Sequence, residues 1–312
     1  MNDIIKSWAD IMTFGGGRYF IVPTGVFLFA LLLANPISLF AIFSSSKLLQ
    51  ETRYKLLANT LITDLLYSFI CFALTATNIS PVIFPDLLCE ILLSLQTVVF
   101  FSGFLNITAM GVNIYLAINW PLQYNSIFTP SRAVKLIVTI WLLSSIIPLV
   151  SYILLSGDQG LLCDIPVCFF NILFFLPHPN PVVQEMNYVA VVVMCTACSV
   201  LVFVCFYLLV WRTRKSGIWT GMHSKARQTI TIHCLIFSFY FLPTIIMVIQ
   251  RVLLSYRLMH IKSMLYVTMT VSNVVLLIPK ALTPYLHGFR CEELSVAIQS
   301  LLKGRSQISP SG

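Results

Sequence analysis

Seven long apolar segments constrain this chain more than any other feature. In a helix, about 20 apolar residues cross the ~30 Å hydrocarbon layer, at a rise of 1.5 Å per residue. Inside a bilayer the backbone must satisfy its own hydrogen bonds, and a helix does so within one segment. We therefore predict an all-α membrane protein, a seven-transmembrane helix bundle. The segments are Phe20–Phe43, Leu56–Ala76, Ile91–Ile118, Ala133–Leu155, Tyr188–Trp211, Thr229–Ile249 and Met264–Leu286.

The composition leaves little room for a water-soluble domain. Of the 312 residues, 58% are hydrophobic and 10% are charged, whereas a soluble domain averages about 25% charged. Met1–Phe14 contains Asp3 and Asp10 and lacks a continuous apolar core, so no cleavable signal peptide is expected. The two halves of the chain are not similar to each other, which argues against the inverted-repeat transporters.

The distribution of basic residues predicts the orientation in the membrane. Basic loops stay in the cytosol, so we expect residues 1–19 to be extracellular, 20–287 to form the transmembrane domain and 288–312 to be cytoplasmic. The net charge of +8 then reflects the topology of a chain whose partner is the lipid bilayer. Nucleic acid is not an expected partner, because no basic patch on a folded face is indicated. The basic residues of the predicted cytosolic connections are Lys47, Arg53, Lys55, Arg132, Lys135, Arg212, Arg214, Lys215, Lys225, Arg227, Arg290, Lys303 and Arg305.

Cysteine usage predicts one structural bridge. The nine cysteines do not form the two paired C-x-x-C spacings of a metal site, so no metal or cofactor is expected. Cys89 opens the third segment, and the long outer connection contains Cys163 and Cys168. The extracellular side is oxidising, so we expect Cys89 to bridge to one of these two, and the sequence does not choose between them.

Two Asn-X-Ser/Thr sequons are present. Asn78 begins one at the outer end of the second segment, where Pro81 and the nearby membrane disfavour its use. Asn106 begins the other inside the third segment, where it is inaccessible. Asn78 is therefore the candidate glycosylation site.

Several local motifs agree with one known family. Together with seven segments, an outside N-terminus and a cysteine opening the third segment, they resemble a rhodopsin-like G-protein-coupled receptor. No single motif is specific, but their order and spacing are. The motifs are Asn35 in the first segment, Leu57–Leu65 with Asp64 in the second, Trp141 in the fourth, Tyr240–Pro243 in the sixth, Leu282–His287 with Pro284 in the seventh, and Gly288–Arg290 at the start of a short helix.

Two further stretches narrow the resemblance. Ser216–Trp219, and Ser224–Thr229 followed by His233, are similar to an orphan receptor of the family. Fish odorant-receptor-like proteins are the alternative, because they share His233 and the region Tyr54–Leu66. A plasma-membrane receptor with an unknown extracellular ligand is therefore implied, and an odorant receptor is the alternative.

The chain departs from the family at its activation motifs. The resemblance implies an acid and an arginine at the end of the third helix, but the chain has Asn113, Ile114 and Tyr115 there. The family arginine meets the G protein, which isoleucine cannot do. His287 also replaces the family's tyrosine, whereas Tyr207 is retained. A heterotrimeric G protein is thus the implied partner, with weak, constitutive or absent coupling all open.

Asp64 and Lys280 are the aspartate and lysine that lie well inside the predicted spans. A charge at this depth costs several kcal/mol unless it faces the interior and is paired. The resemblance places Asp64 opposite the seventh helix, where the family aspartate helps bind sodium. We expect the Lys280 ammonium to meet Asp64 and occupy that sodium site, with Gly103 leaving room; the alternative is that Lys280 snorkels elsewhere. An opsin's lysine would stand at Leu277, so a photopigment is not expected.

The resemblance also implies a ligand pocket that opens outward. Amine receptors carry a carboxylate at the position of Gln96, so an amine ligand is disfavoured and a small, mostly apolar ligand is expected. Taken singly, each pocket position is also explained by ordinary helix packing. The positions are Gln96, Thr97, Phe100, Phe241, Thr244, Ile245 and Asn273.

The predicted cytosolic face has two further features. Trp211–Arg227 contains five basic residues and no acid, which indicates an acidic partner or anionic lipid, or topology alone. The tail Phe289–Leu302 carries one apolar face, typical of a helix that lies on the membrane. Cys291 beside it is a candidate for palmitoylation or an unmodified thiol. The apolar residues of the tail are Leu294, Ala297, Ile298, Leu301 and Leu302.

Three other function classes compete with a receptor. A non-signalling seven-span scaffold or heteromer partner is suggested by Ile114. A transporter or channel would need more polar residues within the spans. No nucleophile, base and orienting group converge in any segment, so the sequence does not predict an enzyme.

Overall fold

The computed structural model describes residues 7, 11, 16–79, 86–155, 181–215, 224–290 and 292–302, and all regular structure in these ranges is helical. Seven helices are long and apolar enough to cross a membrane, so the predicted seven-span, all-α architecture is confirmed. The elements are η1 (Gly17–Phe20), α2 (Ile21–Ser44), α3 (Ser46–Leu49), α4 (Thr52–Ile79), α5 (Asp86–Asn119), α6 (Pro121–Ile127), α7 (Pro130–Leu155), α9 (Pro181–Lys215), α11 (Ser224–Ser255), α12 (Ile261–Thr270), η2 (Val271–Val275), α13 (Leu277–Arg290) and α14 (Glu292–Leu302).

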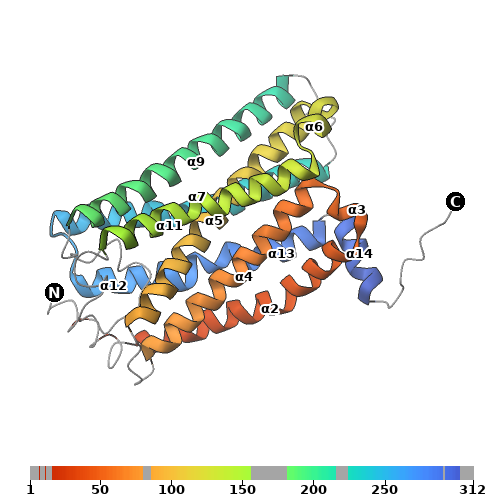
Figure 1. The fold of residues 1–312 in the computed structure, drawn as a ribbon. Helices are drawn as coiled ribbons and strands as arrows, with labels where there is room; N and C mark the ends of the chain where they lie inside the picture. The colour runs from red at the N-terminus through yellow and green to blue at the C-terminus, as the bar shows by residue number, and fades with distance from the viewer. Residues whose placement is uncertain are drawn as a thin grey trace.

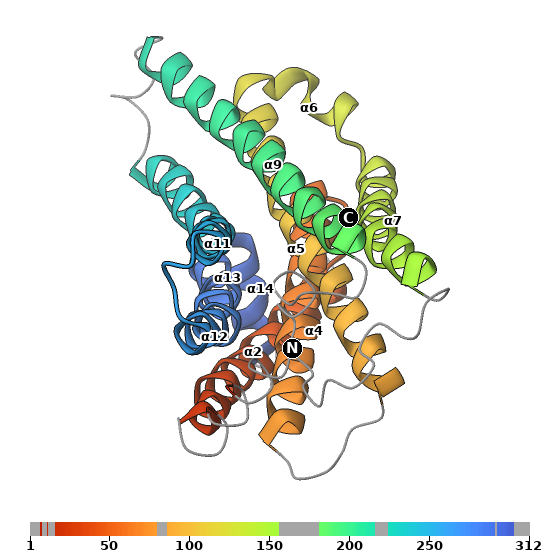
Figure 2. The ribbon, with the colours of Figure 1, turned by 90° about the vertical axis from the view of Figure 1, so that its left-hand side faces the viewer.

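The third span, α5, lies at the centre of the bundle. It packs against α4, α7 and α9, and Figure 2 shows it between α4 and α9. Its 34 residues extend to about 50 Å, longer than the hydrocarbon layer. Phe101 and Phe104 are almost wholly buried, because neighbours cover several faces of this helix. Pro121 then starts α6 in its first turn, where the missing amide hydrogen costs little.

The outer spans show the opposite pattern, with apolar side chains on their exposed faces. In α2, Val22, Val26, Phe29 and Leu33 are exposed, at the three- and four-residue spacing of one helix face. The opposite face buries Leu28, Leu31 and Asn35 against the bundle. An exposed apolar stripe of this length suits contact with lipid chains rather than with water.

The seventh span contains a π-helical turn. The Leu276 amide donates to the Val271 carbonyl at 3.0 Å, five residues back, so η2 joins α12 to α13 with one extra residue in the turn. This interruption was not predicted from the sequence, which indicated one continuous helix. The helix also continues to Arg290, so the prediction that Gly288–Arg290 start the next helix is wrong.

The C-terminal helix α14 lies beside α2 and α13, as Figure 1 shows. Leu294 is fully buried, and Ala297, Ile298 and Leu301 pack with it against a cluster that includes Leu48. The bundle therefore covers Leu294 fully and the rest of this apolar face in part, and the contact of this helix with the membrane stays a prediction. We call the end of the bundle that holds α3, α6, α14 and the C-terminus of α9 the basic end, because Lys47, Arg53, Arg132 and Arg212 lie there.

Candidate functional site

A buried ion pair joins the second and seventh spans. The Lys280 Nζ lies 2.9 Å from the Asp64 Oδ1, with the two side chains 1% and 0% exposed. Asp64 comes from the middle of α4, and Lys280 comes from the first turn of α13. We predicted this pair because a single buried charge is costly, and the structure places the two charges in contact.

Two tyrosines surround the lysine ammonium. The Lys280 Nζ lies 4.7 Å from the ring centroid of Tyr67 and 5.0 Å from that of Tyr240, within the range of cation–π attraction. The Tyr240 hydroxyl also donates to the Asp64 Oδ1 at 2.9 Å. One carboxylate oxygen therefore accepts bonds from α11 and α13, and it links three helices at the bundle centre.

A glycine in α5 leaves space for this arrangement. A Cβ atom built on Gly103 would lie 3.4 Å from the Lys280 Nζ and 3.9 Å from the Thr63 Oγ1. A methyl group would just fit, and a larger side chain would enter the space of the ammonium. Gly103 is therefore the position at which the third span permits the pair.

Sequence reasoning missed both tyrosines. Tyr67 follows Asp64 by three residues in α4 and so shares its helix face, a spacing that could have identified it. Tyr240 lies on another span, and no local spacing connects it to Asp64. The sequence did place Tyr240 within the motif Tyr240–Pro243, but as a resemblance only.

A polar seam continues from the pair along α4 and the seventh span. The Thr75 Oγ1 donates to the Asn273 Oδ1 at 2.9 Å, and the Cys71 Sγ lies 3.4 Å from the same oxygen. Asp64, Cys71 and Thr75 are spaced along one face of α4. Asn273 lies within the π turn η2. The π turn is therefore the part of the seventh span that makes this hydrogen bond with α4.

Most of the predicted pocket residues are buried in the bundle. Gln96 is 1% exposed, and Thr97, Phe100, Thr244 and Asn273 are also buried, while Phe241 packs against the same core. Their side chains are neutral, as the sequence states. Ordinary helix packing gives the same burial, so the assignment of these residues to a ligand pocket stays a prediction.

Two predicted positions face away from the bundle. Ile245 is 40% exposed and belongs to the outward stripe of α11 that includes Leu242, Ile249 and Val252, so its assignment to the pocket is wrong. Tyr207 is 69% exposed, whereas its neighbour Phe206 is buried. Tyr207 thus projects outward from α9, and the structure does not bring it to the other activation residues.

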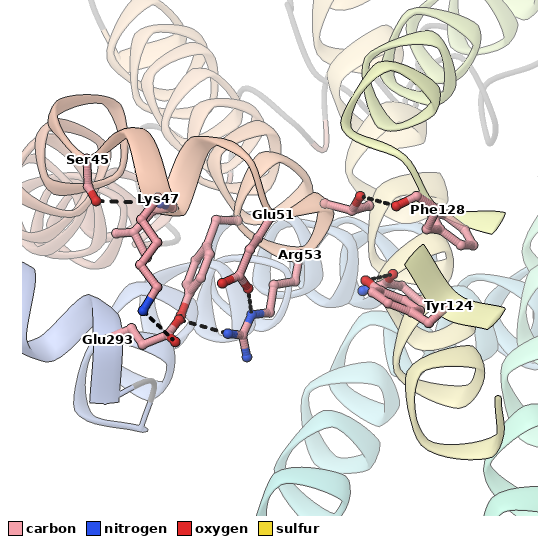
Figure 3. Close-up of polar contacts among 11 residues, drawn as sticks. Ser45, Lys47, Glu51, Arg53, Tyr124, Phe128 and Glu293 are labelled. Carbon is pink, nitrogen blue, oxygen red and sulfur yellow. Dashed lines mark hydrogen bonds and ion pairs between the residues drawn. The ribbon is translucent and has the colours of Figure 1, made fainter. Parts of the chain in front are cut away.

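At the basic end, a glutamate of α14 gathers three side chains from the α3–α4 region (Figure 3). The Glu293 Oε2 accepts from the Arg53 Nη2 at 2.8 Å and from the Tyr54 hydroxyl at 3.0 Å. The Lys47 Nζ lies 3.7 Å from the Glu293 Oε1. Glu51 in turn accepts from the Arg53 Nε at 2.6 Å. These contacts fasten α14 to the bundle through partly exposed charges and one buried tyrosine.

The same region reaches the end of the third span through α6. The Thr52 hydroxyl donates to the Phe128 carbonyl at 3.2 Å, and the Tyr124 hydroxyl donates to the Asn113 Oδ1 at 2.8 Å, as Figure 3 shows. Burial raises the pKa of Tyr124. The phenol therefore stays protonated and able to donate. Asn113 thus has a neutral partner on α6.

The remaining activation residues lie nearby or outside the described part of the chain. Ile114 is partly buried, and Tyr115 packs edge-on against Trp120 with ring centroids 5.8 Å apart. Pro243 lies inside α11 and Pro284 inside α13. The side chain of His287 is outside the described residues.

The candidate modification sites are only partly described. Cys89 is disulfide-bonded, but both candidate partners, Cys163 and Cys168, lie outside the described residues, as does Cys291. Asn78 lies in the last turn of α4. The choice of disulfide partner, glycosylation and palmitoylation all stay predictions.

A bundle of seven spans around a polar centre, with a short eighth helix packed at one end, defines the class of seven-transmembrane receptors. The chain belongs to the family described as 7 transmembrane receptor (rhodopsin family), whose profile matches residues 34–282. Members of this family are receptors rather than enzymes, and the predicted resemblance is confirmed.

Similar proteins include the human protein named Probable G-protein coupled receptor 148, which is 27% identical and aligned over 91% of this chain and 82% of its own length. Odorant receptor 131-2 of Danio rerio is 23% identical over 86% of this chain and 81% of its own length. The Octopamine receptor Oamb of Drosophila melanogaster is 33% identical, but over only 38% of this chain and 19% of its own length. Two of these similarities therefore cover most of the bundle, and the third covers a segment.

Proposed function

We propose that this protein is a plasma-membrane receptor that transmits the binding of an extracellular, non-amine ligand to a partner in the cytosol. The observation that carries the proposal is the contact of Asp64 with both Tyr240 and Lys280. A ligand that moves α11 or the seventh span must strain or keep these bonds. We infer that breaking or keeping these bonds separates two states of the bundle, as transmission of a signal requires.

The neutral pocket residues support a ligand that is not a biogenic amine. Recognition of an ammonium in a buried site needs an opposing charge, and Gln96 supplies only an amide. Amine-receptor relatives such as the Octopamine receptor Oamb cover only part of this chain. We infer a small, mostly apolar ligand that accepts or donates a few hydrogen bonds among Gln96, Thr97 and Thr244.

The basic end is proposed to face the cytosol, with the N-terminus outside the cell, because basic connections are retained inside. On this end Leu122 of α6 is 98% exposed and Trp120 is 39% exposed. Both residues lie in the connection between α5 and α7, where a protein partner rather than lipid would cover them. A heterotrimeric G protein is the proposed partner, although Ile114 removes one family contact.

The test is basal nucleotide exchange. The full chain is reconstituted with a panel of purified heterotrimeric G proteins, and GDP–GTP exchange is measured with and without the receptor. We expect a measurable acceleration for at least one heterotrimer, and a larger one for Ile114→Arg. If no heterotrimer responds to either protein, the chain is a non-signalling seven-span protein and the proposal fails.

A chemosensory receptor is the second candidate function. Its support is the alignment with Odorant receptor 131-2 over 86% of this chain. The two candidates share the cytosolic mechanism and differ in ligand. Volatile and water-soluble odorants applied to cells that express the chain with a responding G protein distinguish them, because an orphan receptor for an internal ligand gives no response.

A further inference from the structure

The N-terminal part of the chain places one isoleucine inside the bundle. Ile11 is 1% exposed, although it precedes the first span, which begins at Ile21. Ser7, one helical turn earlier, is also helical but only partly buried. The first residues of a chain are well ordered only where contacts hold them. Ile11 therefore attaches the chain upstream of the first span to the bundle.

A glycine turn separates Ile11 from the first span. Gly16 has a φ of +78°, a conformation that glycine adopts without the steric cost of a side chain. A Cβ atom built on it would also lie 3.3 Å from the Tyr19 Cδ2. The short helix η1 that follows contacts both α2 and α12. The chain thus changes direction at Gly16, beside the start of the seventh span.

Ile11 belongs to the apolar cluster that fills the end of the bundle opposite the basic end. There the cluster includes Leu74 near the end of α4, Leu93 near the start of α5, and Met264 and Leu265 near the start of α12. Each of these four side chains is at most 5% exposed. Residues of three spans therefore form the apolar surroundings that one aliphatic side chain of the N-terminal segment joins.

The same cluster continues toward the centre of the bundle. It includes Phe100, one of the predicted pocket residues, and Tyr240, whose hydroxyl donates to Asp64. Ile11 is thus part of one continuous packing arrangement that extends to the buried ion pair. A side chain that leaves or enters the place of Ile11 would change the packing around this path.

We propose that Ile11 makes the N-terminal segment the resident occupant of the outer, apolar end of the ligand site, and that an extracellular ligand binds by displacing it. The inference rests on the proposed function. The ligand then has to present an aliphatic group of its own, because that is the chemistry that the cluster around Ile11 accepts.

A tethered occupant needs little affinity of its own to fill such a site. A segment joined by a short connection acts at an effective concentration of about 1 mM. Even weak binding therefore keeps the site filled most of the time, and any competing ligand binds with a correspondingly lower apparent affinity.

The experiment labels single cysteines on intact cells that express the full chain. Ile11→Cys and Tyr19→Cys are each treated with a membrane-impermeant maleimide, and the labelling of the unsubstituted chain is subtracted. Tyr19 is 78% exposed and is the matched control in the same part of the chain. We expect Ile11→Cys to be labelled about tenfold more slowly, because its thiol reacts only while the segment is released.

A synthetic peptide with the sequence of residues 1–16, which contains no cysteine, then tests displacement. At about 1 mM the peptide matches the effective concentration of the tethered segment. It should therefore fill about half of the sites and raise the labelling rate of Ile11→Cys about fivefold. The same peptide with Ile11→Asn should have no effect, because its amide would be buried without a hydrogen-bond partner.

The outcomes separate this inference from the proposed function. Equal labelling rates for Ile11→Cys and Tyr19→Cys would overturn the inference. A slow rate that the peptide does not change would show fixed packing rather than a displaceable occupant, and equal effects of the two peptides would show unspecific binding; both results overturn it as well. All three leave the receptor function standing. If Tyr19→Cys is not labelled on intact cells, the N-terminus is not outside and the proposed function itself fails.

Discussion

The pair formed by Asp64 and Lys280 is held by more than mutual attraction. Each charge would cost several kcal/mol if left unpaired at this depth, and the pair is almost fully shielded from solvent. Tyr240 donates to the carboxylate, and the rings of Tyr67 and Tyr240 face the ammonium. The side chains around the pair therefore offset part of the cost of removing both charges from water.

A charge-neutralising double mutant measures this coupling. Asp64→Asn and Lys280→Met should each lower stability by about 3–5 kcal/mol, because each leaves one buried charge without its partner. The double mutant should be more stable than the sum of the single effects predicts, by on the order of 2 kcal/mol. The readout is thermal unfolding in detergent, with Lys135→Met as an exposed control. Strictly additive losses would show that the two residues do not interact.

The same variants test whether Lys280 stands in for a sodium ion. In the family that this chain belongs to, the aspartate at the position of Asp64 commonly helps bind sodium. Exchanging sodium for N-methylglucamine should leave the wild-type unfolding temperature unchanged, because the ammonium already neutralises Asp64. Lys280→Met should gain a sodium-dependent increase. A sodium-dependent wild type would mean that a free cation still reaches the carboxylate.

Among the elements, α14 and α6 are tied to the bundle by the α3–α4 region. Glu293 binds Arg53 and Tyr54, and Thr52 reaches α6 through the Phe128 carbonyl. Tyr124 of α6 then binds Asn113 of the third span. A polar route thus runs from the C-terminal helix to the end of α5, although the acid and arginine of the family are missing from α5.

The attachment of α14 depends on Glu293. Glu293→Gln weakens the two charged contacts, and Tyr54→Phe removes the one buried donor, at about 1 kcal/mol for each variant. Amide hydrogen exchange across residues 292–302 should therefore be about fivefold faster in either variant. Gln299→Ala, on the exposed face of α14, is the control. Unchanged protection in both variants would show that the apolar contacts of Leu294 hold the helix without the polar ones.

The positions of the helices could be predicted from the sequence more accurately than which side of each helix faces the core. Span length and the cost of a buried charge are properties of single segments or residues, so seven helices and the partnership of Asp64 were accessible. Whether Ile245 or Tyr207 faces the core depends on which neighbours pack against α11 and α9. The π turn at Val271–Val275 rotates the later residues of the span about the helix axis. No residue type in the turn predicts it from the sequence. Tyr240 was missed for the same reason, because its partner lies on another span.

At the scale of the whole molecule, charge distribution defines two different ends. The basic end gathers Lys47, Arg53, Arg132 and Arg212, together with α14. The other end includes Cys89, which is disulfide-bonded, and the contact between Arg251 and Glu185. Disulfides persist in oxidising compartments, and basic connections are retained in the cytosol. The two arguments are independent, and both support the proposed orientation.

Epitope tags test that orientation. A tag before Met1 should be accessible to antibody on intact cells, and a tag after Gly312 only after permeabilisation, because the basic connections hold the C-terminal side in the cytosol. Flow cytometry of both tagged proteins, each before and after permeabilisation, gives the readout. Labelling of the Gly312 tag on intact cells would reverse the orientation, and the proposal that the basic end binds a cytosolic partner would be lost with it.

The extra residue in η2 has a consequence for how this chain tolerates insertions and deletions. Loss of one residue from a regular helix turns every later side chain by about 100° relative to those before it. Loss of one residue from Val271–Val275 would instead let the π turn relax into ordinary α-helix. Met269 and Lys280 would then keep their present directions, so the seventh span has one place where its length can change while Lys280 still reaches Asp64.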